Sequence, residues 1–403
     1  MGEKGSGGFD TRFALLNHRA RVVSLRASRY GATGACDSGD VDYLRRWPDF
    51  ESAELRAWDA ADSLILDEAA PLLGGQALTV IGDDYGALTL GVLAAGAESV
   101  RVHQDSIVGE RALRANAERA PIPGPFEQLA LAAELVSGAR LVLVRLPRSL
   151  DALDEIAALI AAHASPEVTV IAGGRLKHMS LRMNEVLGRH FGRLDVSHAR
   201  QKSRLLIARQ PVPGAAPALR RELHDDLGLQ VVATGGVFAG TSVDIGTRAM
   251  LAAFDQLPEY TSAIDLGCGT GILAAGLKRL RPQAAVLATD RSAAAASSAR
   301  LTAEANRLDV RVTQDDAASA EPEGSADLVL LNPPFHTGAA VDPRIATHLF
   351  AAAARVLRPG GELFTVFNSH LGYRPQLQRI VGPTRQISRN AKFTVTASVT
   401  APQ

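Results

Sequence analysis

Lysine and cysteine are scarce in this chain of 403 residues. Its two cysteines, Cys36 and Cys268, cannot build a disulfide framework and lack the spacing of a zinc site, which is typical of proteins in a reducing compartment. No apolar run approaches the roughly 20 residues of a membrane helix, and the N-terminus lacks the apolar segment of a signal peptide. We therefore expect a cytoplasmic protein without a metal centre or a membrane anchor.

An excess of charge of either sign is also absent. The 43 basic and 43 acidic residues give a formal net charge of zero, so no overall positive field marks a nucleic-acid-binding protein. Because nearly all the basic residues are arginine in an alanine-rich chain, the arginine content reflects coding bias and is weak evidence for phosphate binding. Any contact with RNA has to come from local patches.

The length predicts more than one domain, and an apolar content of 46% is enough for several cores. Residues 1–40 are rich in Gly, Ser and Arg without a hydrophobic period, which predicts a disordered arm; a solvated extension is favoured over an RNA contact. Residues 211–218, rich in Pro and Ala, form the best linker. The expected units are therefore 41–212 and 213–403.

Short apolar segments alternate with helical patterns in both units. Strands are predicted at 78–81, 100–103, 141–144 and 168–171, and again at 263–266, 286–289, 310–313, 328–331 and 362–367. A helix is predicted at 55–66. Alternating strands and helices indicate mostly parallel sheets that are covered on both faces. The expected fold class is therefore α/β, with two tandem Rossmann-like units.

The two units also repeat one another. Gly82 and Gly267 occupy similar strand-to-helix loops, and Asp105 and Asp290 follow them at the same spacing, each at the end of the next predicted strand. The segment 141–148 then falls roughly over 328–335. The repeated offset favours an ancient duplication over two unrelated α/β units.

A glycine-rich loop in the second unit, from Asp265 to Gly271, predicts a cofactor site. Gly267, Gly269 and Gly271 let a ligand approach the backbone, and the helix that follows favours negative charge at its start. Their spacing, Gly-x-Gly-x-Gly, differs from the Gly-x-Gly-x-x-Gly of dinucleotide-binding enzymes. We expect Asp265 to hold the ammonium group of a methionine moiety and the helix start to hold its carboxylate.

Acidic residues end the next two strands. Asp290 is placed to bind both ribose hydroxyls, although a plain helix cap is the alternative. Asp316 is placed to bind the adenine amino group, with Asp315 as its rival and an ordinary turn as the alternative. With the glycine loop, these carboxylates indicate S-adenosyl-L-methionine as the cofactor.

The motif that decides the chemistry is Asn332-Pro333-Pro334-Phe335, directly after an apolar strand. The two prolines stiffen the loop. The side-chain carbonyl of Asn332 and the backbone carbonyl of Pro333 can accept both hydrogens of one amino group, which localises the nitrogen lone pair for methyl transfer without a metal. Phe335 would stack on a base taken out of its helix. A plain turn is the alternative. The motif predicts an enzyme that methylates an exocyclic amino group.

From about residue 44 the chain resembles the bacterial 23S ribosomal RNA guanine-N2 methyltransferases, close to the 16S enzymes. The stretches that carry the resemblance are 332–336, 236–240, 243–246, 44–48, 57–62, 85–88, 171–174 and 368–373. The resemblance implies two tandem Rossmann-like domains with a degenerate first one, and ribosomal RNA or a ribosomal subunit as partner. It implies that Phe238 and Asp244 frame the cofactor and base pocket and that His336 contacts the substrate. Ala239 departs from the family, which usually has Ser there.

The first unit has lost the catalytic pattern. Asp83, Asp84 and Tyr85 stand where the second unit has Cys268, Gly269 and Thr270. Arg145-Leu-Pro-Arg148 replaces the Asn-Pro-Pro-Phe motif. Two carboxylates disfavour a cofactor that presents its own carboxylate, whereas Arg145 and Arg148 suit phosphate. We expect this unit to bind RNA rather than cofactor.

Several alternatives stay open from the sequence. Methyltransferases that act on DNA adenine or on protein glutamine also use Asn-Pro-Pro-aromatic motifs, and the 16S enzymes share the catalytic pattern. A catalytically silent ribosome-assembly factor is the alternative from another functional class. The expected oligomeric state of the protein is a monomer.

Overall fold

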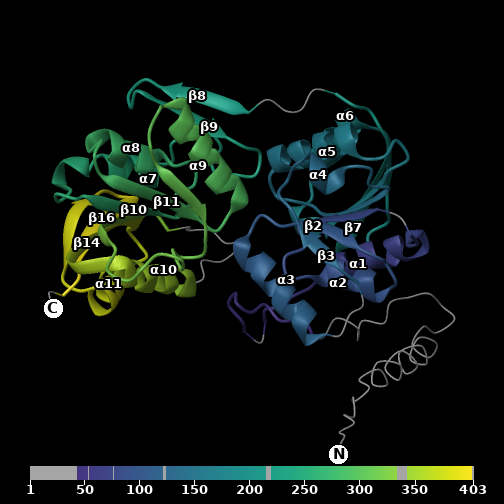
Figure 1. Ribbon diagram of the computed structural model, residues 1–403, viewed down its shortest axis with the longest axis horizontal. Helices are drawn as coiled ribbons and strands as arrows, with labels where there is room; N and C mark the ends of the chain where they lie inside the picture. Colours follow the sequence, from purple (N-terminus) through teal and green to yellow (C-terminus); the bar gives the residue numbers. More distant parts are fainter. Residues whose placement is uncertain are drawn as a thin grey trace, which may run out of the picture.

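The computed structural model describes residues 43–52, 54–75, 77–120, 124–214, 219–333 and 343–401. The expected arm, residues 1–40, therefore lies outside the described residues. Figure 1 shows two α/β halves side by side, the first in purple to teal and the second in green to yellow. Among the described residues, no helix is long and apolar enough to span a membrane.

The first half is built on a seven-stranded sheet with the order β3-β2-β1-β4-β5-β7-β6. Its strands are β1 (Leu78–Ile81), β2 (Val100–His103), β3 (Phe126–Gln128), β4 (Leu141–Arg145), β5 (Thr169–Arg175), β6 (Phe191–Val196) and β7 (Ser203–Pro211). The helices are α1 (Ala60–Ala69), α2 (Ala87–Ala94), α3 (Ile107–Arg119), α4 (Ala133–Val136), α5 (Leu150–His163) and α6 (Leu181–His190), with 3-10 turns at Ala70–Leu72 and Leu176–His178. Apolar clusters form the core on both faces.

The second half repeats this order as β12-β11-β10-β13-β14-β16-β15. Its strands are β10 (Ser262–Leu266), β11 (Ala285–Asp290), β12 (Arg311–Gln314), β13 (Ala326–Leu331), β14 (Leu357–Asn368), β15 (Thr384–Arg389) and β16 (Phe393–Val399). The helices are α7 (Ile245–Leu251), α8 (Ile272–Leu280), α9 (Ala293–Ala305), α10 (Pro343–Val356) and α11 (Arg374–Ile380), with a 3-10 turn at Phe254–Gln256. The identical orders confirm the predicted fold class of two tandem Rossmann-like units.

Some predicted elements need correction. The helix predicted at 55–66 begins only at Ala60, because the Asp59 side chain caps its first turn together with Asp62. The last strands of each sheet, including the antiparallel β7 and β16, were not predicted. Neither was the hairpin of β8 (Arg220–His224) and β9 (Leu229–Ala233), which packs on α9. Residues 215–218 of the expected linker lie outside the described residues.

Strand register corrects the predicted alignment of the two halves. Ile81 pairs with His103 in the first sheet, and its counterpart Leu266 pairs with Thr289 in the second. The difference in residue number between equivalent positions of the two halves is therefore larger by one in the second of these strands than in the first. The structural counterpart of Asp290 is Gln104, so the pairing of Asp105 with Asp290 was wrong.

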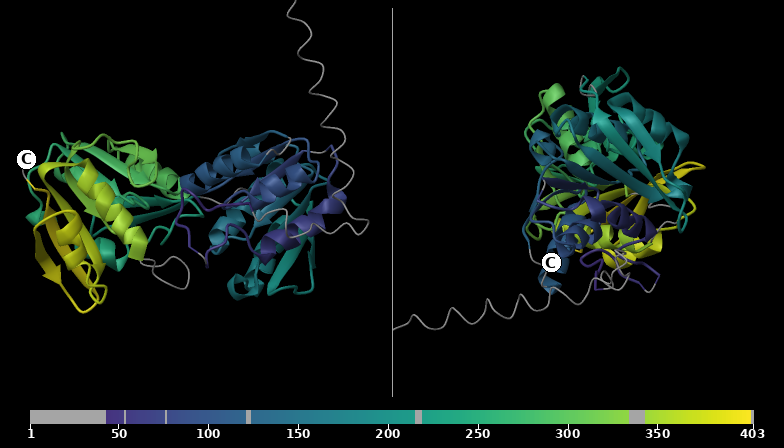
Figure 2. Two further views of the ribbon diagram at one scale, coloured as in Figure 1. Left: turned by 90° about the horizontal axis from the view of Figure 1, so that it is seen from below. Right: turned by 90° about the vertical axis from the view of Figure 1, so that its right-hand side faces the viewer.

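Equivalent segments of the two halves contact each other reciprocally. The amide of Ile107 donates to the carbonyl of Arg291 (3.0 Å), and the amide of Ala293 donates to the carbonyl of Asp105 (2.7 Å). With the corrected alignment, the two bonds join equivalent positions of the two halves, with donor and acceptor exchanged. A pseudo-twofold axis therefore runs between Ser106 and Ser292. Figure 2 shows the starts of α3 and α9 meeting where the halves join.

Candidate functional site

The glycine loop after β10 leaves room for a ligand. Gly267 and Gly269 have φ of +78° and +53°, and a Cβ added to either would meet no atom within 4 Å. Gly271 differs, because its added Cβ would lie 2.9 Å from the Cβ of Ala299. The first two glycines thus form an open cradle, whereas Gly271 lets α8 pack closely against α9.

Asp265 lies under this loop and is only 1% exposed. Its Oδ2 accepts a hydrogen bond from the amide of Ala274 at 2.9 Å, which ties the strand end to the first turns of α8. Burial raises the pKa of Asp265 to about 7. A cation beside this carboxylate would favour its charged form, so the predicted contact with an ammonium group suits the environment.

Asp290 faces the glycine loop from the end of β11. Its Oδ2 accepts from the amide of Gly269 and its Oδ1 from the amide of Ser292, both at 3.0 Å. Ser292, rather than Asp290, is the N-cap of α9. The helix-cap alternative for Asp290 is therefore wrong, and each carboxylate oxygen retains a lone pair for a ligand.

Replacing Asp290 with alanine is expected to weaken cofactor binding by about 1–3 kcal/mol, the scale of hydrogen bonds to a charged group. Titration calorimetry with S-adenosylmethionine measures this loss. Ser292→Ala is the matched control, because it removes the α9 cap and leaves the carboxylate. Wild-type affinity in Asp290→Ala would contradict the ribose-binding role.

The structure distinguishes Asp315 from Asp316. Asp315 has a buried side chain and accepts hydrogen bonds from the amides of Asp316 and Ala320, both at 2.8 Å. Asp316 is more open, and its Oδ2 lies 3.3 Å from Nε2 of His348 on α10. No described residue hydrogen-bonds to its Oδ1. Asp315 thus shapes the turn, and Asp316 stays the candidate for the adenine amino group.

Asn332 follows β13 and is oriented by the start of α7. Its Nδ2 donates to Oγ1 of Thr247 (3.2 Å) and to Oδ2 of Asp244 (3.4 Å). Asp244 is the N-cap of α7, and the Thr247 hydroxyl donates to it. Because a carboxylate only accepts hydrogen bonds, the amide nitrogen of Asn332 must face it. Oδ1 of Asn332 is left buried and without a partner among the described residues.

The rest of the motif is only partly placed. Pro333 is buried beside Asn332. The predicted site residues Pro334, Phe335 and His336 lie outside the described residues. Phe238 is 79% exposed and lines a groove shared with the first half, whereas Asp244 contacts Asn332. Thr247 was missed by sequence reasoning, although it stands on the first turn of the helix that Asp244 caps.

The first half contains a remodelled copy of this constellation. Register places Arg145 at the position of Asn332, because Ile81 pairs with Val144 and Leu266 with Leu331. Arg145 contacts the carboxylates of Asp59 (2.9 Å) and Asp62 (3.1 Å). When the two halves are aligned by pairing Gly82 with Gly267, Asp59 corresponds to Asp244 and Asp62 corresponds to Thr247.

Arg145, Asp59 and Asp62 thus form an ion-paired triad in the first half, at the position that corresponds to the Asn332 site of the second half. A Cβ on Gly82, the counterpart of Gly267, would meet the Cβ of Arg145 at 3.3 Å, so the old cradle is also closed. The prediction that this half has lost its cofactor site therefore has a steric basis. The charge argument made from the sequence does not hold for Asp83, because its carboxylate is buried, accepts hydrogen bonds from the amides of Leu88 and Thr89, and has a pKa raised by burial.

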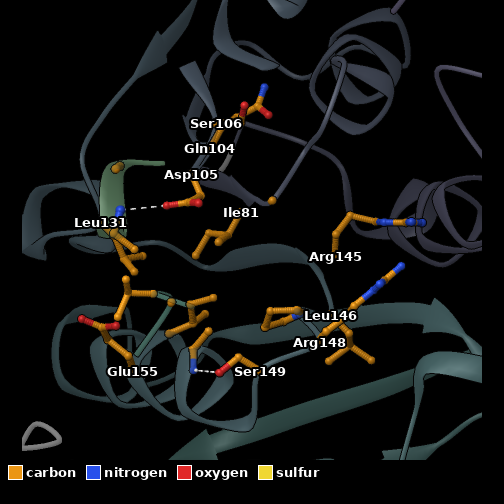
Figure 3. A pocket seen from close by; sticks show the side chains of 18 of the residues that line it. Ile81, Gln104, Asp105, Ser106, Leu131, Arg145, Leu146, Arg148, Ser149 and Glu155 are labelled. Atoms are coloured by element: carbon orange, nitrogen blue, oxygen red, sulfur yellow. Dashed lines mark hydrogen bonds between the residues drawn. The ribbon is translucent and has the colours of Figure 1, made fainter. Parts of the chain in front are cut away.

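Beside this triad runs a groove of about 1500 Å³, lined by both halves. Figure 3 shows Arg145 and Arg148 on one side of it and Asp105 and Leu131 on the other. Arg148 and Lys177 are exposed at its rim. Arg148 and Lys177 place positive charge beside His178. Partial desolvation, together with these cations, lowers the pKa of His178. Arg145 itself is only 20% exposed and is paired.

No group of three His, Cys, Asp or Glu side chains suited to a metal ion occurs within the described ranges.

Two family models match the chain: the RLMG N-terminal domain over residues 36–212 and the methyltransferase small domain over residues 228–397. The boundary between them falls near the predicted linker.

Curated relatives match along nearly their whole length. "Ribosomal RNA large subunit methyltransferase G" of Streptomyces coelicolor is 36% identical over 372 residues, covering 88% of this chain and 97% of the relative. The protein of that name from Stutzerimonas stutzeri is 34% identical over 375 residues, covering 89% and 97%. The chain belongs to this family. The predicted family and the prediction of a methyltransferase are thereby confirmed.

A solved structure shows the same two-unit fold. The T. thermophilus 16S rRNA N2 methyltransferase, in complex with AdoMet and guanosine, has a TM-score of 0.70 and 22% identity, covering 85% of this chain and 92% of that one. At 22% identity, the structural similarity supports the fold of this chain.

Proposed function

We propose that this member of the methyltransferase G family transfers a methyl group from S-adenosyl-L-methionine to N2 of a guanine in large-subunit ribosomal RNA. The observation that carries the proposal is Oδ1 of Asn332, which is buried and has no hydrogen-bond partner among the described residues. A buried acceptor without a donor costs free energy, and an amino group in the site would remove that cost. The relatives' name supplies the RNA class.

The residues around the glycine loop fit the cofactor. Gly267 and Gly269 leave open space beside their Cα atoms, with Asp265 beneath and Gly271 at the start of α8. Asp290 and Asp316 stand at successive strand ends for the ribose and the adenine. When bound there, S-adenosylmethionine supplies an electrophilic methyl group on its sulfonium.

Asn332 prepares the acceptor nitrogen. Its Oδ1 and the carbonyl of Pro333 accept the two hydrogens of the guanine amino group, which localises the nitrogen lone pair. Asp244 and Thr247 hold the Asn332 amide so that Oδ1 stays turned to the substrate. Pro334 stiffens the loop, Phe335 stacks on the base and His336 contacts the substrate. Phe238, exposed on the groove wall, contacts the RNA.

The reaction product tests this proposal. Ribosomal RNA methylated in vitro and digested to nucleosides is expected to yield N2-methylguanosine by mass spectrometry, with large-subunit RNA as the substrate. N6-methyladenosine would overturn the base assignment, and labelling confined to small-subunit RNA would overturn the target. Binding of cofactor without transfer to any RNA would favour a silent assembly factor.

The first half, residues 41–212, serves RNA recognition in this proposal, and 213–403 forms the catalytic domain of a cytoplasmic monomer. Arg145 is committed to its ion pairs, so the RNA contact falls mainly on Arg148. Cations without acidic partners attract phosphate.

Charge reversal at Arg148 is therefore expected to weaken RNA binding about tenfold at low salt and less at high salt. Cofactor affinity should stay unchanged. Fluorescence anisotropy with labelled ribosomal RNA measures the effect, with Arg182→Glu, exposed on α6, as the matched control. Equal losses in the two variants would point to net charge rather than to this site.

A further inference from the structure

The adenine side of the cofactor site contacts the first half of the chain. Arg111, on α3, donates to Oδ1 of Asp315 at 2.9 Å. The same oxygen accepts from the amide of Asp316, so the guanidinium fixes the turn that presents Asp316. The side chain of Asp315 is only 7% exposed, which limits the alternative positions open to this turn.

A second contact from the first half reaches Asp316 through His348. Phe50, from the segment before α1, packs edge-on against His348, with ring centroids 6.0 Å apart. His348 in turn holds Oδ2 of Asp316. Arg344 spans the same junction, because it lies over the Phe50 ring and donates to the carbonyl of Glu51 at 3.1 Å. One oxygen of Asp316 is therefore fixed through His348, while Oδ1, to which no described residue hydrogen-bonds, is the oxygen for a ligand.

The first half also holds the end of β12. Gln314 donates through Nε2 to the carbonyl of Asp105 at 3.1 Å, directly before the Asp315–Asp316 turn. The backbone on one side of Asp316 is thus fixed by Asp105 and Arg111, and its side chain by Phe50 through His348. These anchoring residues belong to the half that has lost its own cofactor cradle.

We propose that the first half completes the adenine subsite of the catalytic half, with Arg111 and Phe50 as positioning residues that hold Asp316 ready for the adenine amino group. The inference rests on the proposed role of Asp316. It assigns the first half a part in cofactor recognition that is independent of RNA. Neither residue touches the cofactor; both act through the geometry of Asp316.

The test compares two ligands that differ at the adenine amino group. S-adenosylhomocysteine carries this group, and S-inosylhomocysteine carries an oxygen in its place. The wild-type chain is expected to prefer the adenosyl compound by roughly 10–100-fold, the range for a hydrogen bond to a charged group. In Arg111→Met and in Phe50→Leu this preference should fall at least about threefold, with Arg111→Lys retaining most of it.

Arg114→Met is the matched control, because Arg114 lies one turn further along α3 and pairs with Glu110 of the same helix. Its preference should equal that of the wild type. Equal weakening of both ligands in Arg111→Met and Phe50→Leu, or an unchanged preference, would overturn the inference. If Arg111→Met does not fold, Phe50→Leu decides alone.

Asp316→Ala separates the two levels of the proposal. If this variant keeps the wild-type preference, the proposed role of Asp316 fails, and the inference fails with it. If Asp316→Ala loses the preference while Arg111→Met and Phe50→Leu keep it, only the inference fails. Loss of the preference in all three variants supports both.

Discussion

Replacing Asn332 with alanine is expected to lower the rate of methyl transfer by about 10²–10³-fold, the scale for removing one preorganised hydrogen-bonding group. Cofactor affinity should stay close to that of the wild type, because Oδ1 of Asn332 is assigned to the acceptor amine. Single-turnover transfer of a labelled methyl group, with calorimetry for the cofactor, measures both quantities.

Thr247 provides a graded control for this experiment. Thr247→Val removes the hydroxyl oxygen that accepts a hydrogen bond from Nδ2 of Asn332. The rate is expected to fall about tenfold, the scale of one hydrogen bond, because the amide is less firmly oriented. Thr247→Ser keeps the hydroxyl and should restore most of the rate. Full activity in Asn332→Ala would refute the mechanism, whereas a loss confined to cofactor binding would reassign the residue.

The second large effect is on stability. Arg145→Ala should lower the free energy of unfolding of the first half by about 3 kcal/mol, the low end for breaking a buried ion pair. The carboxylates of Asp59 and Asp62 would then lie close together without their cation. Burial already raises the pKa of Asp62 to about 7, against the opposing effect of Arg145.

Urea unfolding followed by circular dichroism measures this change. Arg148→Ala is the matched control: it follows shortly after Arg145, is exposed, and forms no ion pair within the described part of the chain, so its midpoint should stay near that of the wild type. Similar midpoints for Arg145→Ala and the wild type would show that the triad contributes little to stability.

The repeat shows how far sequence reasoning could reach. Gly82 and Gly267 were aligned correctly because the turn geometry requires glycine in both halves. Gln104 and Asp290 were not aligned, because one extra residue in the second half shifts the register and a conspicuous Asp105 stands one position away. Only the strand pairing shows that shift.

Side-chain assignments reached a different limit. The sequence alone left Asp315 and Asp316 as rivals, since both follow the same strand; hydrogen bonds of the turn distinguish them. Arg145 was expected to face RNA because its partners, Asp59 and Asp62, are distant from it in the chain. Yet Asp59 precedes Asp244 by the same offset that relates Gly82 to Gly267, so the repeat contained a signal for this triad.

The reciprocal bonds about Ser106 and Ser292 have the form of an isologous interface, in which one patch meets its own copy. Such a contact is the kind that two identical chains form across a twofold axis, here made between two halves of one chain. In a homodimer both copies of a position carry the same residue. Here the equivalent positions hold Asp105 and Arg291, which are opposite in charge. Because the two halves are parts of one chain, each position can differ from its counterpart, and one half carries the Asn332 motif while the other contacts the turn that presents Asp316.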